Sequence, residues 1–435
     1  MFNNPFTEII ESSVERNSRR TFLKLAALGG STAVMYQSAY GAIPTWIQEA
    51  AQTKASVKAK RCVFIYLQGG PSHLDTFDLK PGHANGGEFK PLETAVSGIQ
   101  ISEHFPNLAK EMKDICIIRS MTTKEGNHER GRYLVHTGYA PQAAVQHADW
   151  GSILSHEVGD PKFDLPAFVS VGGGAYTGGY FGSQHSPFAI QRASQPLEDV
   201  ALPDGVSKER YEERRKLLKE LDTRFEKKTS SPAVEPHKNI YNRADRLMKS
   251  PLLEAFDINK EEAKSRDAYG TDEFGKSCLL ARRLIEAGVT CIQVALNGWD
   301  THQNNFPRVQ ELSGKLDIGM SQLIRDLRSR GLLKDTIVMC FGEFGRTPRI
   351  NDSGRDHYPK TWSAVLAGGG IKGGQVVGST TPDGMDIKDR PVTIPDLYRT
   401  LGSQFGVDTH QVNFAGPRPI TLVDKAGVMI PELIA

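Results

Sequence analysis

Residues that can bind a metal or transfer a proton follow three apolar segments of the chain. The polar residues in question are Gln68, Ser72, His73, Asp75 and Asp78 after the first segment, Asn297, Trp299, Asp300, His302 and Asn304 after the second, and Glu343, Arg346 and Arg349 after the third, with Arg355, Asp356 and His357 close behind. Zinc and other divalent ions need fixed lone-pair donors of this kind. One Asp-x-His pair is more often an ordinary loop. Here, however, a carboxylate or a histidine follows each of the three segments, and this indicates a metal site.

A further histidine, His128, lies in the segment Gly126–Arg132 between Asn127 and Glu129. An imidazole in this setting can be a metal ligand, a nucleophile or a general base. A surface salt-bridge cluster is the alternative. The arginines are equally open, because they can clamp an anionic oxygen group or simply join loops to one another.

The elements that must position these residues are buried strands. Continuous apolar runs occupy residues 61–67, 115–119, 167–171, 289–296, 336–341 and 364–367, and such runs are typical of strands covered on both faces. Helical periodicity at residues 274–287 and 309–327 separates some of them. The alternation predicts an α/β fold with a doubly wound, mostly parallel sheet, in which ligands bind at the carboxyl ends of the strands.

The remaining segments add a helical insertion and buried cysteines. A charged helix at residues 207–228 has only a narrow apolar stripe, and we expect it to be a solvated surface helix within an insertion at about 205–270. Cys62, Cys116, Cys291 and Cys340 each lie in an apolar run, which predicts buried core thiols rather than disulfides or metal ligands. With 53 Lys and Arg against 51 Asp and Glu, no basic field indicates a nucleic-acid partner.

The N-terminal segment has the pattern of an export signal. Ser18–Lys24 contains Arg19 and Arg20, and the apolar stretch that follows is too short and too interrupted to span a membrane. We expect a twin-arginine signal peptide at 1–42, a linker at 43–60 and one domain at 61–435. The twin-arginine translocation machinery would then be a partner, and the processed protein would work in the periplasm or outside the cell without being an integral membrane protein.

These motifs together resemble a bacterial family of exported proteins that is catalogued only as a domain of unknown function, within the alkaline phosphatase and sulfatase superfamily. The matching segments are Leu67–Asp78, Leu280–Leu284, Asp300–His302, Gly342–Pro348, Gly354–His357 and Gly368–Gly374. The resemblance implies an alkaline-phosphatase-like fold with divalent ions that polarise a phosphate or sulfate ester. It implies Asp300, His302, Glu343 and His357 as metal ligands. Glu343 would be the carboxylate of the superfamily's Asp-His pair, and Phe344 stands where the histidine of that pair is expected.

Two positions depart from the superfamily pattern. Gln68 stands where an aspartate is expected, which leaves His73 or Asp75 as substitute ligands, and His128 stands where a serine or cysteine nucleophile is expected. These departures would fit one metal with direct attack by water, or a site that binds without turnover.

We therefore expect a metal-dependent hydrolase of sulfate or phosphate esters, acting on a small molecule or a glycan with zinc or calcium. His128 would bind the metal or activate the attacking group, and Arg346 would stabilise negative charge on the ester. The substrate would contact Gln68, Arg130, Arg349, Arg355 and Trp299. The alternative is a non-catalytic glycan- or partner-binding protein with a degenerate metal site. A redox protein is disfavoured, because the sequence has no Cys-x-x-Cys motif.

Overall fold

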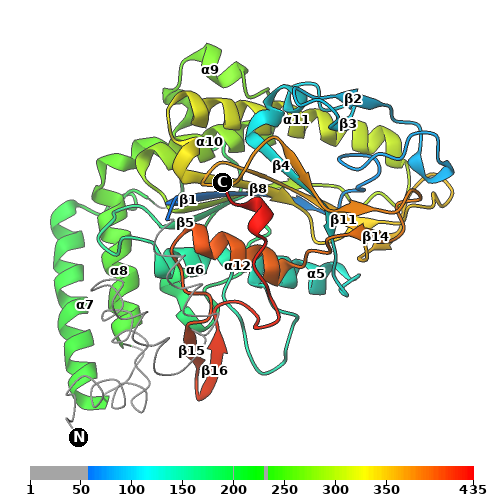
Figure 1. Ribbon diagram of the computed structural model, residues 1–435. Helices are drawn as coiled ribbons and strands as arrows, with labels where there is room; N and C mark the ends of the chain where they lie inside the picture. Colours follow the sequence, from blue (N-terminus) through cyan, green and yellow to red (C-terminus); the bar gives the residue numbers. More distant parts are fainter. Residues whose placement is uncertain (1–56, 199, 230–233) are drawn as a thin grey trace, which may run out of the picture. The chain divides into compact units, whose positions relative to one another are not determined.

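The computed structural model describes residues 57–198, 200–229 and 234–435 (Figure 1). The expected signal peptide at 1–42 and most of the expected linker therefore lie outside the described residues. Within them, no helix is both long enough and apolar enough to span a membrane.

One sheet of eight strands forms the centre of the described part, in the order β12-β4-β11-β8-β1-β7-β5-β6. The strands are β1 (Arg61–Gln68), β4 (Ile115–Met121), β5 (Phe168–Val171), β6 (Phe188–Ile190), β7 (Cys291–Asn297), β8 (Thr336–Phe341), β11 (Trp362–Ala367) and β12 (Gln375–Val377). All neighbours pair in parallel except β11, which is antiparallel to both β8 and β4. Seven strands therefore point the same way.

Helices cover both faces of this sheet (Figure 1). On one face α10 (Glu273–Ala287) and α11 (Asn305–Ser329) pack on the core that contains Val63, Ile65 and Leu67 of β1. On the other face the core contains Phe64 and Tyr66 together with residues of α5 (His128–Thr137), α6 (Trp150–Glu157) and α12 (Ile394–Gln404). Burial of both faces explains why the strands are continuous apolar runs. The predicted α/β class with a mostly parallel, doubly wound sheet is confirmed.

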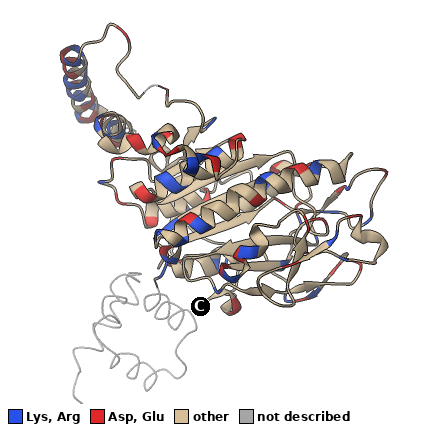
Figure 2. Cartoon of the chain, turned by 90° about the horizontal axis from the view of Figure 1, so that it is seen from above, with Lys and Arg blue, Asp and Glu red and all other residues tan. Residues whose placement is uncertain are grey.

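The segment from 205 to 270 holds α7 (Lys208–Thr229), α8 (Val234–Lys249) and α9 (Ala263–Asp267). No side chain of α7 is buried, and Leu217, Leu221 and Phe225 are each about half exposed. Both signs of charge are interspersed over the described elements (Figure 2), in keeping with the near-zero net charge.

Short antiparallel pairs complete the structure. They are β2 (Pro91–Glu93) with β3 (Gln100–Ser102), β9 (Gly345–Arg346) with β10 (His357–Tyr358), β13 (Ser379–Thr380) with β14 (Ile387–Asp389), and β15 (Val412–Ala415) with β16 (Arg418–Thr421).

All five cysteines are free and buried, as predicted for the four in the strands. Burial raises the pKa of the Cys116 thiol to about 12, because the thiolate would lose its hydration in the core.

Candidate metal centre

The carboxyl ends of three parallel strands and one short antiparallel pair supply the site. The segment after β4 leads to α5, whose first residue is His128; the loop after β7 carries Asp300 and His302; and the loop after β8 carries Glu343. The β9–β10 pair places His357 opposite Arg346. Parallel strands end at one edge of a sheet, so side chains far apart in the sequence meet there.

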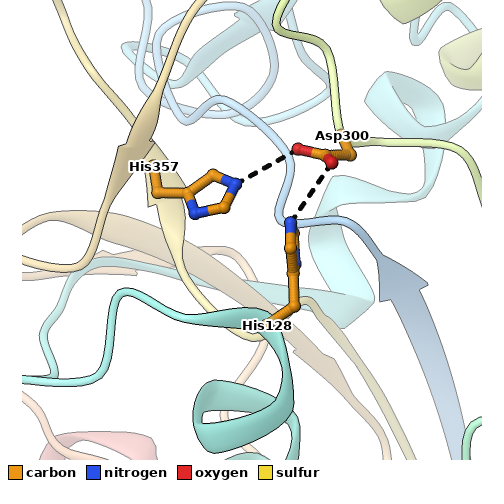
Figure 3. Close-up of side chains that lie close together, drawn as sticks. All are labelled: His128, Asp300 and His357. Atoms are coloured by element: carbon orange, nitrogen blue, oxygen red, sulfur yellow. Dashed lines mark hydrogen bonds and ion pairs between the residues drawn. The ribbon is translucent and has the colours of Figure 1, made fainter.

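His128, Asp300 and His357 form a compact cluster, shown in Figure 3. One nitrogen or oxygen atom from each lies within 4.8 Å of the others. The two carboxylate oxygens of Asp300 point to different rings, since Oδ2 lies 3.3 Å from Nε2 of His128 and Oδ1 lies 3.3 Å from Nε2 of His357. The side chains are 26% to 45% exposed, so solvent reaches the cluster.

His302 is a fourth member of the cluster. Its Nε2 lies 3.0 Å from Asp300 Oδ1 and 3.0 Å from Nε2 of His357. The predicted ligands Asp300, His302 and His357 therefore converge, and the predicted His128 joins them.

The fourth predicted ligand, Glu343, faces the other side of the His128 ring. Its Oε1 lies 2.7 Å from His128 Nδ1 and accepts a 2.9 Å hydrogen bond from the Gly69 amide, while its Oε2 accepts one from the Tyr66 hydroxyl at 3.1 Å. The Glu343 side chain is only 1% exposed. Its hydrogen bond raises the pKa of His128, against the opposing effect of burial. Glu343 thus orients the His128 ring and does not itself reach the cluster.

Each of the three imidazoles is fixed through its Nδ1. The acceptors are Glu343 for His128, the Gly126 carbonyl at 2.9 Å for His357, and Asp356 at 2.9 Å for His302. A carbonyl or carboxylate only accepts hydrogen bonds, so the proton of each neutral ring is assigned to Nδ1. Each Nε2 then presents a lone pair toward Asp300.

Three nitrogen lone pairs beside a carboxylate are unfavourable without a cation among them. Nε2 of His302 and Nε2 of His357 face each other at 3.0 Å, and Nε2 of His128 is buried without a hydrogen-bond partner among the described residues. Histidine ligands whose other ring nitrogen donates to a carboxylate or carbonyl are the usual arrangement around a bound metal. The donor set therefore fits a divalent ion.

Arg346 lies behind Asp300 and does not face solvent. Its side chain is 0% exposed and donates to Asp300 Oδ1 and to the carbonyls of Gly69, Gly70 and Arg355. Burial alone would raise the pKa of Asp300, but the hydrogen bond and charge of Arg346 lower it to about 2. Arg346 keeps Asp300 ionised and in place. Its expected role, stabilising negative charge on the ester, stays a prediction, and the described contacts of its buried guanidinium are all with protein acceptors.

His73 and Asp75, the predicted substitute ligands, and Arg355, a predicted substrate contact, form hydrogen bonds or ion pairs in the interior instead. Asp75 and Arg355 form a fully buried ion pair, with both carboxylate oxygens 2.8 Å from the guanidinium, and Asn305 also donates to Asp75. His73 is buried, with its Nε2 3.1 Å from the Gly384 carbonyl and 3.2 Å from the Thr361 hydroxyl. None of these side chains bonds to the cluster.

The other predicted substrate contacts are dispersed. Trp299 is fully buried, and Arg130 pairs with Glu125 on the exposed side of α5. Arg349 is exposed. Gln68 ends β1 next to the cluster and is partly exposed, while its carbonyl accepts from the amides of Gly298 and Trp299.

Sequence patterns assign no specific role to Tyr66, Asp356 or the Gly126 carbonyl. Asp356 and the Gly126 carbonyl fix cluster histidines directly, and Tyr66 does so through Glu343. Asp356 adjoins His357 in the Gly354–His357 motif, which was a usable signal. Tyr66 lies within an apolar strand, so no signal marks it. Phe344 is fully buried, and its ring centre lies 5.1 Å from that of His128 and 4.8 Å from that of His357.

A protein-family model matches residues 59–434, and its description is "Protein of unknown function (DUF1501)". The chain belongs to this family. No curated protein matches the sequence.

Several solved structures align with this DUF1501 protein over most of its length. The PsFucS1 sulfatase from Pseudoalteromonas sp. is 11% identical over 84% of this chain and 72% of its own, with a TM-score of 0.40. A protein in the alkaline phosphatase superfamily from Vibrio parahaemolyticus is 12% identical over 85% and 77%, with a TM-score of 0.39. The phosphonate monoester hydrolase SpPMH from Silicibacter pomeroyi is 10% identical over 80% and 73%, with a TM-score of 0.30.

Proposed function

We propose that this DUF1501 protein is a metal-dependent hydrolase of phosphate or sulfate esters with a single metal centre. The observation that carries the proposal is the convergence of three Nε2 atoms on Asp300, each from a histidine whose Nδ1 is held by an acceptor. His128, Asp300, His302 and His357 would hold the ion.

The donor set favours zinc or a similar transition metal over calcium. Imidazole nitrogen and carboxylate oxygen suit zinc, whereas calcium takes six to eight oxygen ligands. Phe344 packs on two of the histidine rings, so we propose one ion where the superfamily resemblance implies several.

The chain's own residues would prepare the site for hydrolysis. When bound, the ion would supply Lewis acidity toward a phosphoryl or sulfuryl oxygen. Arg346 keeps Asp300 ionised, and Glu343 keeps the proton of His128 on Nδ1. Because position 128 is histidine, we propose direct attack by water in place of a covalent serine or cysteine intermediate.

Arg132 is the cation that we assign to the anionic substrate in place of Arg346. It lies four residues after His128 on α5, so the two side chains share one face of the helix. Its side chain is 30% exposed, its Nε donates to the Tyr176 hydroxyl at 3.2 Å, and its guanidinium lies 5.0 Å from the centre of the Tyr176 ring.

The first test is metal content and turnover of the purified full chain. We expect about one equivalent of zinc by elemental analysis and hydrolysis of aryl phosphates or aryl sulfates. His302→Ala with His357→Ala should abolish both, whereas His237→Ala, which removes an exposed histidine of α8, should change neither. A wild-type protein that binds no divalent ion would refute the proposal.

Arg132→Ala tests the substrate contact. We expect a loss of about tenfold or more in kcat/KM, the value of one hydrogen bond to a charged group. Arg130→Ala is the matched control, because Arg130 is on the same helix and pairs with Glu125 as Arg132 pairs with Glu129. An equal effect of both substitutions would contradict the assignment.

The rival proposal is a non-catalytic binding protein that keeps one metal. The burial of Arg346 and the ring of Phe344 favour it, because both positions lack the exposed polar groups expected of a superfamily hydrolase. A zinc-loaded protein that binds glycans but hydrolyses neither class of ester would establish it.

Export through the twin-arginine route remains part of the proposal. It rests on Ser18–Lys24, which lie outside the described residues. Replacing Arg19 and Arg20 with lysine should retain the protein in the cytoplasm, as cell fractionation would measure.

A further inference from the structure

A basic cavity lies at the edge of the sheet opposite the metal centre. Its volume is about 650 Å³. Its lining includes Val57, Lys58 and Lys60 just before β1, residues 333–335 just before β8, and the glycine-rich turn after β11. The cluster of His128 and Asp300 follows the carboxyl ends of the strands, whereas this cavity lies at the amino ends of β1 and β8.

The charge in this cavity is unbalanced. Its lining has five lysine and arginine side chains, Lys58, Lys60, Lys113, Arg328 and Lys334, against two aspartates. Both aspartates are already paired, Asp114 with Arg328 and Asp335 with Arg61 and Lys60. Lys113 and Lys334 have no ion-pair partner among the described residues, and both are exposed. Arg328 also pairs with Glu111, and Lys58 donates to the backbone oxygen of Ala435. The uncompensated positive charge of the cavity is therefore that of Lys113 and Lys334.

One wall of the cavity is formed by the backbone of three consecutive glycines. Gly368, Gly369 and Gly370 all have positive φ, and a Cβ at Gly368 would lie 2.4 Å from the carbonyl oxygens of Leu333 and Thr336. The chain packs so closely there that only glycine fits. This turn begins the Gly368–Gly374 motif, and none of its contacts involves the metal centre.

We propose that this cavity binds a small organic polyanion, a molecule with several sulfate or phosphate groups. The volume is that of a small-molecule site. A single exposed ammonium attracts an anion only weakly in water, so useful affinity needs a ligand that meets several lysines at once. The proposal does not depend on the metal centre or on hydrolysis.

The test is calorimetric titration of the full-length protein with sucrose octasulfate and, separately, with inositol hexakisphosphate at constant ionic strength. We expect one molecule bound per chain. Lys113→Ala with Lys334→Ala should weaken binding by about tenfold or more, since each exposed charge contributes up to about a factor of five. The two titrations distinguish a sulfated from a phosphorylated ligand.

Two controls decide the outcome. Lys264→Ala with Lys388→Ala removes the same charge from exposed lysines of α9 and β14 and should leave binding unchanged. His302→Ala with His357→Ala should also leave it unchanged. The proposal is overturned if neither polyanion binds, if both lysine pairs have equal effects, or if only the histidine substitutions weaken binding.

Discussion

Replacement of Glu343 by glutamine should weaken metal binding while the fold stays intact. Glu343 Oε1 accepts both the Gly69 amide at 2.9 Å and the His128 ring at 2.7 Å, and Oε2 accepts only from the Tyr66 hydroxyl. A glutamine can keep its oxygen toward His128 and turn its amide toward Tyr66, which can then accept. The substitution removes the charge with little change of shape.

The expected magnitude follows from that single change. A hydrogen bond to a charged group contributes about 1.5 to 3 kcal/mol and a neutral one about 1 kcal/mol. The difference of about 1.4 kcal/mol is a factor of about ten in zinc affinity, at the lower end of what outer-sphere substitutions cost. Glu343→Ala should behave differently, because three donors would lose their acceptor and stability would fall by at least about 3 kcal/mol.

The assay is competition for zinc against a chromophoric chelator, combined with urea unfolding of the metal-free protein. Glu129→Gln is the matched control, since Glu129 is 76% exposed in the first turn of the same helix. The proposed role of Glu343 is refuted if Glu343→Gln binds zinc as tightly as wild type while His357→Ala does not bind it. It also fails if Glu343→Gln unfolds as readily as Glu343→Ala.

Three further substitutions test separate parts of the structure. Asp75→Asn should destabilise the protein by about 3 to 5 kcal/mol in urea without changing its metal content, because it leaves the buried guanidinium of Arg355 unpaired; an unchanged midpoint would contradict this. Burial lowers the pKa of His136 to about 4, below its unfolded value of about 6.5, so stability is present above pH 6.5 and is lost as pH falls toward 4. This one group should cost about 2 kcal/mol between pH 7 and pH 5, and His136→Gln should flatten that part of the urea-measured pH profile. Gly69→Ala should reduce zinc content and thermal stability, since its Cβ would lie 2.3 Å from the backbone after β7, whereas Gly82→Ala, with a similar positive φ and open space around it, should keep its zinc.

The sequence was sufficient for the sheet because doubly covered strands leave a strong signal. The apolar run at 336–341 coincides with β8, and the run at 289–296 overlaps β7 with an offset of two residues at its start. Strand order was beyond reach, because it depends on which strands pair across long separations. The apolar run of β11 does not reveal that this strand is antiparallel to its neighbours.

The site was predicted in part, for a different reason. Asp300, His302 and His357 follow strand ends, and topology alone brings such loops together. The sequence does not show which charged residues of these loops form buried ion pairs and which contact a substrate, because both roles use the same types of side chain. Arg355 and Asp75 neutralise each other in the interior, so neither reached the cluster where the sequence had placed them.

The five buried thiols can report where the folded protein opens locally. They lie on β1, β4, β7, β8 and α10, so each marks a different element of the sheet or of the layer above it. An alkylating reagent at neutral pH reacts with thiolate, which is scarce in the folded state, and each cysteine should be modified only when its element opens. Mass-spectrometric labelling rates of the native protein would thus rank the local stability of the central strands without any introduced probe.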